Sequence, residues 1–87
     1  MMDKENLIRL AAKLLGISEE ESREYSHDID GLDAVYISIP EKGGDSLVVG
    51  TDGTVLYANS SVSYQLHIDE FKKGTRTPLE AFGRTES

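Results

Sequence analysis

The run Asp45-Ser-Leu-Val-Val-Gly-Thr-Asp-Gly-Thr-Val-Leu-Tyr-Ala58 decides the fold of this chain. Two β-rich segments flank Asp52-Gly53, and such a pair between apolar runs is a strong signal for a tight hairpin. A two-residue turn needs positive φ at both central residues, which Gly53 adopts freely and Asp52 tolerates. The register that this turn implies pairs Val49 with Leu56, Val48 with Tyr57, and Leu47 with Ala58.

A third strand precedes the hairpin. The run Ala34-Val-Tyr-Ile-Ser-Ile39 alternates between apolar and polar residues, and Pro40 ends it because proline cannot donate to a ladder. The sequence therefore predicts three antiparallel strands in meander order, at 34–39, 46–50 and 55–58. Both faces of the hairpin are apolar, so at least one of them must be covered.

Three helices are expected around this sheet. Asp3 caps a helix at 4–15 with a wide apolar stripe that ends at Gly16, and Ser18 opens a capping box for a short helix at 19–25. Residues 26–32 are interpreted as a loop. A final helix is expected at 64–73, since its start and stop signals agree, although alternation over 62–68 also fits a strand.

The expected fold class is α+β. It is a three-stranded antiparallel meander with an N-terminal helix and a C-terminal helix packed on it, in the order α-α-β-β-β-α and mainly on one face. The 87 residues are expected to form one small domain, 1–87, with 83–87 a frayed tail.

Composition narrows the class of protein. Cysteine is absent, which excludes disulfides and thiolate chemistry and fits a reducing compartment. The sequence has no apolar run of about 18–20 residues for a membrane span, and its first residues lack the layout of a secretory signal. We expect a cytoplasmic protein that does not associate with membranes.

Charge is concentrated in one segment. The net charge is −7, and residues 17–33 hold seven acids against the single base Arg23, a balance of −6. Nucleic acid is not an expected partner, because binding to phosphates needs an excess of Lys and Arg. An acidic patch attracts a basic protein and raises its association rate. The alternative is a solvated face that only keeps the protein soluble.

No stretch carries a specific catalytic, metal or cofactor motif. The run 28–33 has the acids of a calcium loop, but its third acid follows Gly31, and Ile39 stands at the twelfth position. His27, expected in a loop, and His67, expected on a helix at the rim of the sheet, are forty residues apart. The serines before His67 lie in no nucleophile elbow, and the glycines fit turns rather than phosphate loops. We expect no enzyme and no cofactor.

Three tyrosines are candidates for partner contacts. Tyr36, Tyr57 and Tyr64 are expected to share the sheet face away from the first helix, and tyrosine provides large contact area at low entropic cost. The alternative is that the last helix covers them.

The second half of the chain resembles small bacterial immunity-type domains of the YrhB kind. The resemblance covers about 45 residues, from the run 44–57 to Ile68-Asp-Glu-Phe71. The segment 19–33 has no counterpart in that pattern, and an aromatic-rich strand before the turn is missing. The resemblance implies helix, strands and final helix, and a protein that binds and neutralises a cognate toxin.

The expected function is a non-enzymatic protein-binding module, immunity- or inhibitor-like, whose acidic surface engages a basic partner. The alternative is a small accessory domain that self-associates through an uncovered sheet face. The candidate partner-binding residues are Glu19, Glu20, Glu21, Glu24, Asp28, Asp30, Asp33, Tyr36 and Tyr57.

Overall fold

The computed structural model describes residues 3–39, 45–59 and 61–83. Its elements follow the chain in this order: α1 (Lys4–Leu15), α2 (Glu19–Glu24), β1 (Ser26–Asp28), β2 (Ala34–Ile39), β3 (Asp45–Gly50), β4 (Val55–Ala58), α3 (Tyr64–Lys72) and α4 (Glu80–Gly83). The α+β class is confirmed. Pro40 to Gly44 and the tail from Arg84 to Ser87 lie outside the described residues.

The sheet has four antiparallel strands in the order β1-β2-β3-β4, where three were predicted. The additional strand is β1, which was interpreted as part of a loop. It pairs Ser26 with Ile37, His27 with Tyr36 and Asp28 with Val35. Its three residues carry no β-branched or apolar side chain, so only pairing with β2 makes it a strand.

The β3–β4 hairpin forms with a register one residue away from the prediction. Val49 pairs with Val55 and Val48 with Leu56. The loop has three residues rather than two: the Gly53 N–H donates to the Gly50 carbonyl at 2.9 Å, and the Gly50 N–H donates to the Thr54 carbonyl at 2.8 Å. Only Gly53 has positive φ there, at 86°. This is a type I turn closed by a glycine bulge.

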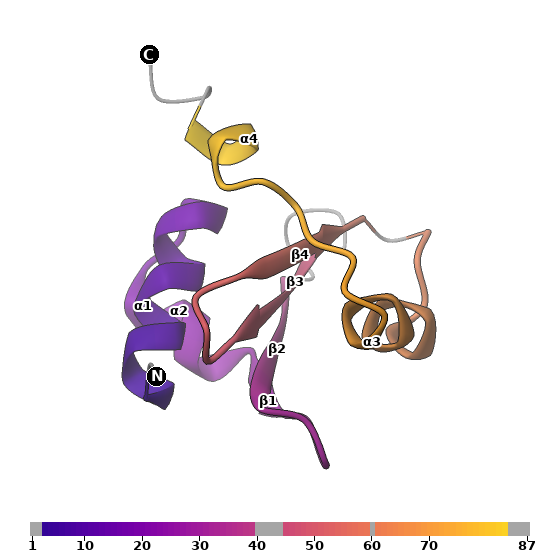
Figure 1. Cartoon of the computed structure of the whole chain (residues 1–87). Coiled ribbons are helices and arrows are strands. Elements are labelled where there is room, and N and C mark those ends of the chain that lie inside the picture. The colour runs from indigo at the N-terminus through magenta and orange to yellow at the C-terminus, as the bar shows by residue number, and fades with distance from the viewer. Residues whose placement is uncertain (1–2, 40–44, 60, 84–87) are drawn as a thin grey trace.

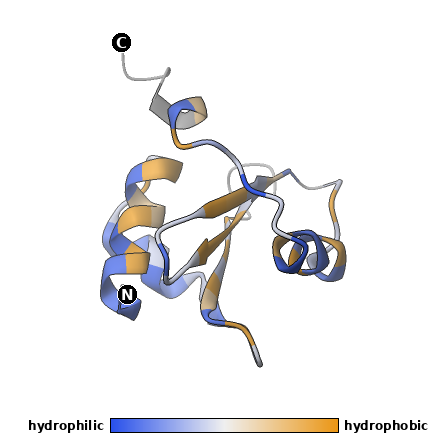
Figure 2. Cartoon of the chain, viewed as in Figure 1, coloured by the Kyte–Doolittle hydropathy of each residue, from blue (hydrophilic) through white to orange (hydrophobic). Residues whose placement is uncertain are grey.

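Helices cover both faces of the sheet, whereas they were expected mainly on one face. Figure 1 shows α1 on one side of the strands and α3 on the other. Alternate strand residues point to opposite faces, and each set is buried against a helix. In Figure 2 the apolar residues of α1 turn toward the sheet.

The core therefore has two halves. Leu7 and Ala11 of α1 pack on Val35, Ile37, Ile39, Leu47, Val49 and Val55. On the other face Ile68 and Phe71 of α3 pack on Ile29, Ala34, Val48 and Leu56. Each fully buried Leu, Ile or Val contributes about 1.5–3 kcal/mol to the hydrophobic term, so both helices are held firmly.

The helix ends follow their capping residues. Asp3 accepts from the Asn6 amide, and Gly16 ends α1 with φ of 71°. Ser63 accepts from the Leu66 amide and begins α3. Leu66 is 49% exposed and points away from the sheet. In the described part of the chain, no helix is long and apolar enough to cross a membrane.

Candidate functional site

The acidic helix α2 is fixed in place by its cap and by one buried serine. Ser18 Oγ accepts from the Glu21 amide at 3.0 Å, while a Glu21 carboxylate oxygen accepts from the Ser18 amide at 3.3 Å. Ser22 is fully buried and donates to the Ile8 carbonyl of α1 at 2.8 Å. Glu21 therefore has a structural role in the capping box, and α2 is held against α1.

Two further acids of the predicted site pair with bases on α1. Asp28 lies 3.1 Å from Lys4 Nζ, and Glu19 lies 3.6 Å from Arg9 Nε. Arg23, the only base in the segment, pairs with Glu5. Water and salt screen exposed pairs of this kind, so they stabilise the fold little; their main effect here is to neutralise part of the local charge.

Four acids of the predicted site keep unpaired, exposed carboxylates. Within the described ranges, no Lys, Arg or His nitrogen lies within 4.0 Å of their carboxylate oxygens, and each residue is exposed. Two of the four are four residues apart on α2 and so share a face of that helix. We call these residues the acidic surface: Glu20, Glu24, Asp30 and Asp33.

The β1–β2 loop holds its two acids on a packed support. Ile29 is buried and Leu32 is half-buried in the core half beneath α3. Gly31 has φ of 73°, the Leu32 N–H donates to the Ile29 carbonyl at 3.3 Å, and the Asp33 carbonyl accepts from Thr51 N–H at 3.0 Å. The apolar residues anchor the loop, and Asp30 is presented to solvent.

The predicted tyrosine surface is divided by the sheet. Tyr36 and Tyr64 meet edge to face with ring centroids 4.7 Å apart on the α3 side. Tyr57 pairs with Leu47, a residue of the α1-side core, so its side chain lies on the opposite face. The expectation that all three share one face was wrong, because the one-residue change of register turns Tyr57 over.

A buried serine–histidine pair lies beneath α3, where sequence reasoning had placed His67 at a rim. His67 is 1% exposed; its Nε2 lies 2.7 Å from the Leu56 carbonyl and its Nδ1 lies 3.3 Å from Ser46 Oγ. The first contact requires Nε2 to carry a proton, so Nδ1 accepts from the serine hydroxyl in the neutral ring. Burial lowers the pKa of His67, and the hydrogen bond to Leu56 partly opposes that effect.

The hydroxyl of this pair is enclosed in the core. Ser46 is 2% exposed, and its hydroxyl also lies 3.4 Å from the Ala58 carbonyl. An open apolar depression of about 130 Å³ lies beside the histidine, between β4 and α3. Its lining includes Leu56, Tyr57, Val62 and Glu70. Ser46 does not line it, so a substrate there would not reach the hydroxyl.

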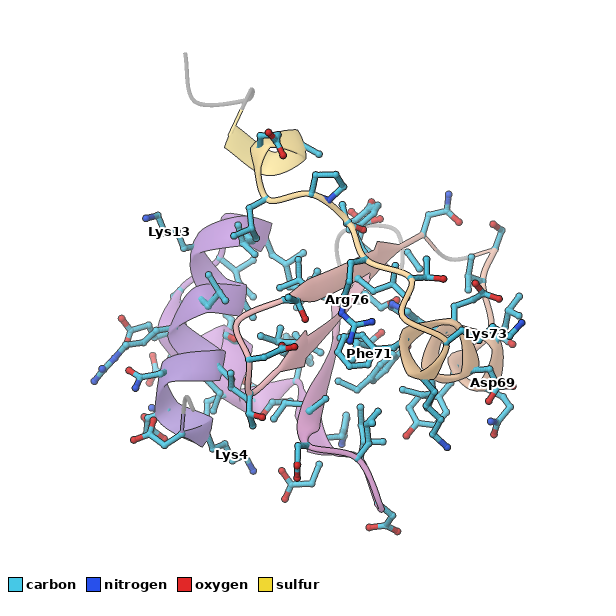
Figure 3. The ribbon with its side chains drawn as sticks, in the orientation of Figure 1. Lys4, Lys13, Asp69, Phe71, Lys73 and Arg76 are labelled. Atoms are coloured by element: carbon cyan, nitrogen blue, oxygen red, sulfur yellow. The ribbon has the colours of Figure 1, made fainter. Side chains whose placement is uncertain are left out.

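The segment after α3 covers the edge of β4. Figure 3 shows Arg76 beside Phe71. The guanidinium carbon lies 3.6 Å from the centroid of the Phe71 ring, and Arg76 donates to Thr54 Oγ1 and to the Phe71 carbonyl at 2.7 Å each. Thr77 then reaches β4: its N–H donates to the Val55 carbonyl at 2.8 Å, and its Oγ1 accepts from Tyr57 N–H at 2.9 Å. The sequence signal for this cover, an extended run before Pro78, is weak.

Among the described residues, no group of three or more His, Asp or Glu side chains is placed to hold a metal ion. His27 lies on β1, and His67 lies in the core beneath α3. The rings of Tyr36 and His67 meet edge to face, with their centroids 5.6 Å apart.

Comparison with protein-family models, with curated proteins and with solved structures finds no match to this chain. The resemblance to YrhB-like immunity domains stays a prediction.

Proposed function

We propose that this chain is a non-enzymatic protein-binding module, immunity- or inhibitor-like, whose acidic surface engages a basic partner and blocks it sterically. The observation that carries the proposal is the set of four exposed carboxylates that form no ion pair within 4.0 Å in the described part of the chain. Such charges are available to steer a positively charged partner and to pair with it.

The support beneath these charges favours binding over simple solubility. Ser22 fixes α2 to α1, and Ile29 and Leu32 fix the β1–β2 loop to the core under α3. Charges on a fixed support lose little conformational entropy when a partner binds. A surface needed only for solubility has no use for such fixed positions.

The edge-to-face pair Tyr36–Tyr64 is the proposed apolar anchor. Tyr64 is 47% exposed, and Tyr36 is half-buried beneath it on the β2 strand that leaves the acidic loop. Aromatic side chains that are already ordered give contact area at low entropic cost. Tyr57, on the other face, does not belong to this anchor.

A cytoplasmic location completes the proposal, on the basis of the cysteine-free composition. Self-association through an uncovered sheet face is disfavoured, because α1 packs on one face and α3 on the other. Self-association through the acidic surface would bring two copies of a −6 segment together. Sedimentation at high micromolar concentration distinguishes the two: the binding module stays monomeric, and a self-associating domain does not.

Charge reversal tests the proposal. The double variant Glu20→Lys with Glu24→Lys changes the acidic surface and leaves the capping box intact. Asp69→Lys with Glu80→Lys is a matched control, since it alters the net charge equally at α3 and α4. Wild type and control immobilised on a resin are expected to retain the same basic protein from a lysate of the source cells, and the test variant is expected to lose it. Equal retention by all three contradicts the proposal.

A further inference from the structure

The two edges of the sheet differ. Along β4, Thr77 hydrogen-bonds to both Val55 and Tyr57, so the chain itself occupies that edge. At the other edge lies β1, which in the described ranges pairs only with β2. Among the residues that the structure describes, no backbone hydrogen bond joins β1 to a segment on its outer side.

The direction of the β1 backbone groups follows from the register. The Asp33 carbonyl accepts from Thr51 N–H, so residues 33, 35 and 37 direct their N–H and C=O groups toward β3. Tyr36 therefore directs its groups toward β1, where it faces His27. Alternation in an antiparallel ladder then turns the N–H and C=O of Ser26 and Asp28 outward.

The charges around this edge indicate what can occupy it. Glu24 precedes β1, Asp28 lies on it, and Asp30 and Asp33 follow it. Among the ion pairs of the described residues, the one that involves this strand joins Lys4 to Asp28. A second copy would bring the same acids against themselves, whereas a strand rich in Lys or Arg would meet opposite charge.

We propose that β1 is the docking strand of the module, and that a basic extended segment of the partner adds to the sheet there as a fifth strand. This inference rests on the proposed function and specifies how its acidic surface is used. The outward groups of Ser26 and Asp28 provide up to four backbone hydrogen bonds. The neighbouring carboxylates select Lys or Arg side chains, and the Tyr36 ring lies beside His27 on the α3 face.

A peptide probe tests the docking strand. The peptide Lys-Val-Lys-Val-Lys-Val is titrated into the whole chain at low salt while amide hydrogen exchange is followed residue by residue. The Ser26 and Asp28 amides are expected to slow more than tenfold at saturation, while the amides of α4 keep their exchange rates. The same peptide with N-methylated backbone positions serves as a control and is expected to give no such slowing.

A pair of variants separates backbone pairing from charge. Asp28→Ala removes the carboxylate and keeps the N–H, while Asp28→Pro removes both; proline is tolerated at an edge where the N–H faces solvent. Loss of one hydrogen bond predicts about fivefold weaker peptide binding by the proline variant than by the alanine variant. Circular dichroism shows whether both variants fold. The exchange experiment uses the wild type and so does not depend on the folding of the variants.

The outcomes are distinguishable. Slowed exchange at Ser26 and Asp28 with the fivefold difference supports the docking strand. Slowed exchange confined to α2 or α3 overturns it, while a charge-dependent capture in the earlier experiment would leave the proposed function standing. Slowed exchange at the same amides that grows with protein concentration and needs no peptide also overturns it, because the occupant is then a second copy.

Discussion

Replacing Gly50 by alanine tests the packing between the β3–β4 hairpin and α3. A methyl group at this position would lie 2.9 Å from Phe71 Cζ and 2.8 Å from Asp52 Oδ1, closer than real Cβ atoms approach their neighbours. Neither neighbour is free to move. Phe71 is 5% exposed beneath the Arg76 guanidinium, and Asp52 Oδ1 accepts from the Thr54 amide at 3.0 Å and from its hydroxyl at 2.6 Å.

The expected magnitude follows from two opposing effects. Forcing a methyl group into a filled site costs about 1–3 kcal/mol, whereas replacing glycine by alanine restricts the unfolded chain and returns about 0.4–1 kcal/mol. We expect Gly50→Ala to lower the free energy of unfolding by about 1–2 kcal/mol. In a domain of this size that corresponds to a decrease in melting temperature of roughly 4–16 °C.

Urea unfolding followed by circular dichroism measures this change, and a double-mutant cycle identifies its cause. Phe71→Leu removes the Cζ atom that the new methyl group would meet. In that background Gly50→Ala is expected to cost at least about 1 kcal/mol less than in the wild type. An unchanged free energy of unfolding for Gly50→Ala would refute the reasoning, and so would an equal cost in both backgrounds.

Three further predictions concern the residues that hold the two helices and the β4 edge. Burial lowers the pKa of His67 in the folded protein, so the unfolded chain binds more protons below about pH 6.5. The free energy of unfolding should therefore fall as the pH decreases from 7 to 5, by at most about 1.4 kcal/mol per pH unit. Urea titrations at several pH values should show a weaker dependence of this free energy on pH in His67→Leu than in the wild type. Ser18→Ala removes the capping box of α2 and should cost about 0.5–2 kcal/mol in a urea titration, with Ser61→Ala as the exposed control outside any helix cap. Arg76→Met keeps the apolar stem but loses the contacts with Phe71 and Thr54, so the free energy of unfolding should decrease by about 1–3 kcal/mol, as measured by thermal unfolding. An unchanged melting temperature would show that the cover of β4 does not depend on this side chain.

The sequence was sufficient for the elements whose signals are local. The helix at 4–15 matches its predicted bounds because Asp3 and Gly16 fix its ends, and α3 appears at 64–72 because Ser63 caps it. The strands at 34–39 and 55–58 also match, since their apolar residues are packed against helices on both sides. In these places capping, periodicity and burial all favour the same structure.

The errors arose where long-range pairing decides. Asp52-Gly53 fits a two-residue turn as well as a three-residue loop, and the hydrogen bond from Gly50 to Thr54 selects the second. The resulting one-residue shift of the β3–β4 register places Tyr57 on the face of the sheet opposite to the predicted one. The strand at 26–28 carries no strand-forming side chains, and it exists only because β2 offers a pairing edge.

The exposure of the candidate acids was predicted in part, and their role in binding stays a prediction. The acids at 20, 24, 30 and 33 are exposed, as expected of a binding surface, but Glu21 is used in a cap, and Glu19 and Asp28 pair with α1. Pairing across elements cannot be inferred from spacing along one segment. The division of the tyrosines between the two faces was missed for the same reason as the hairpin register.

The central claim is that Glu20, Glu24 and their acidic neighbours recruit a basic partner. The most direct measurement is the association rate constant of the captured partner, determined at about 20 mM and about 500 mM salt for the wild type and for Glu20→Lys with Glu24→Lys. The account predicts a rate constant that falls steeply with salt for the wild type and is lower and nearly independent of salt for the variant. Equal rate constants and equal salt dependence for the two proteins would contradict it.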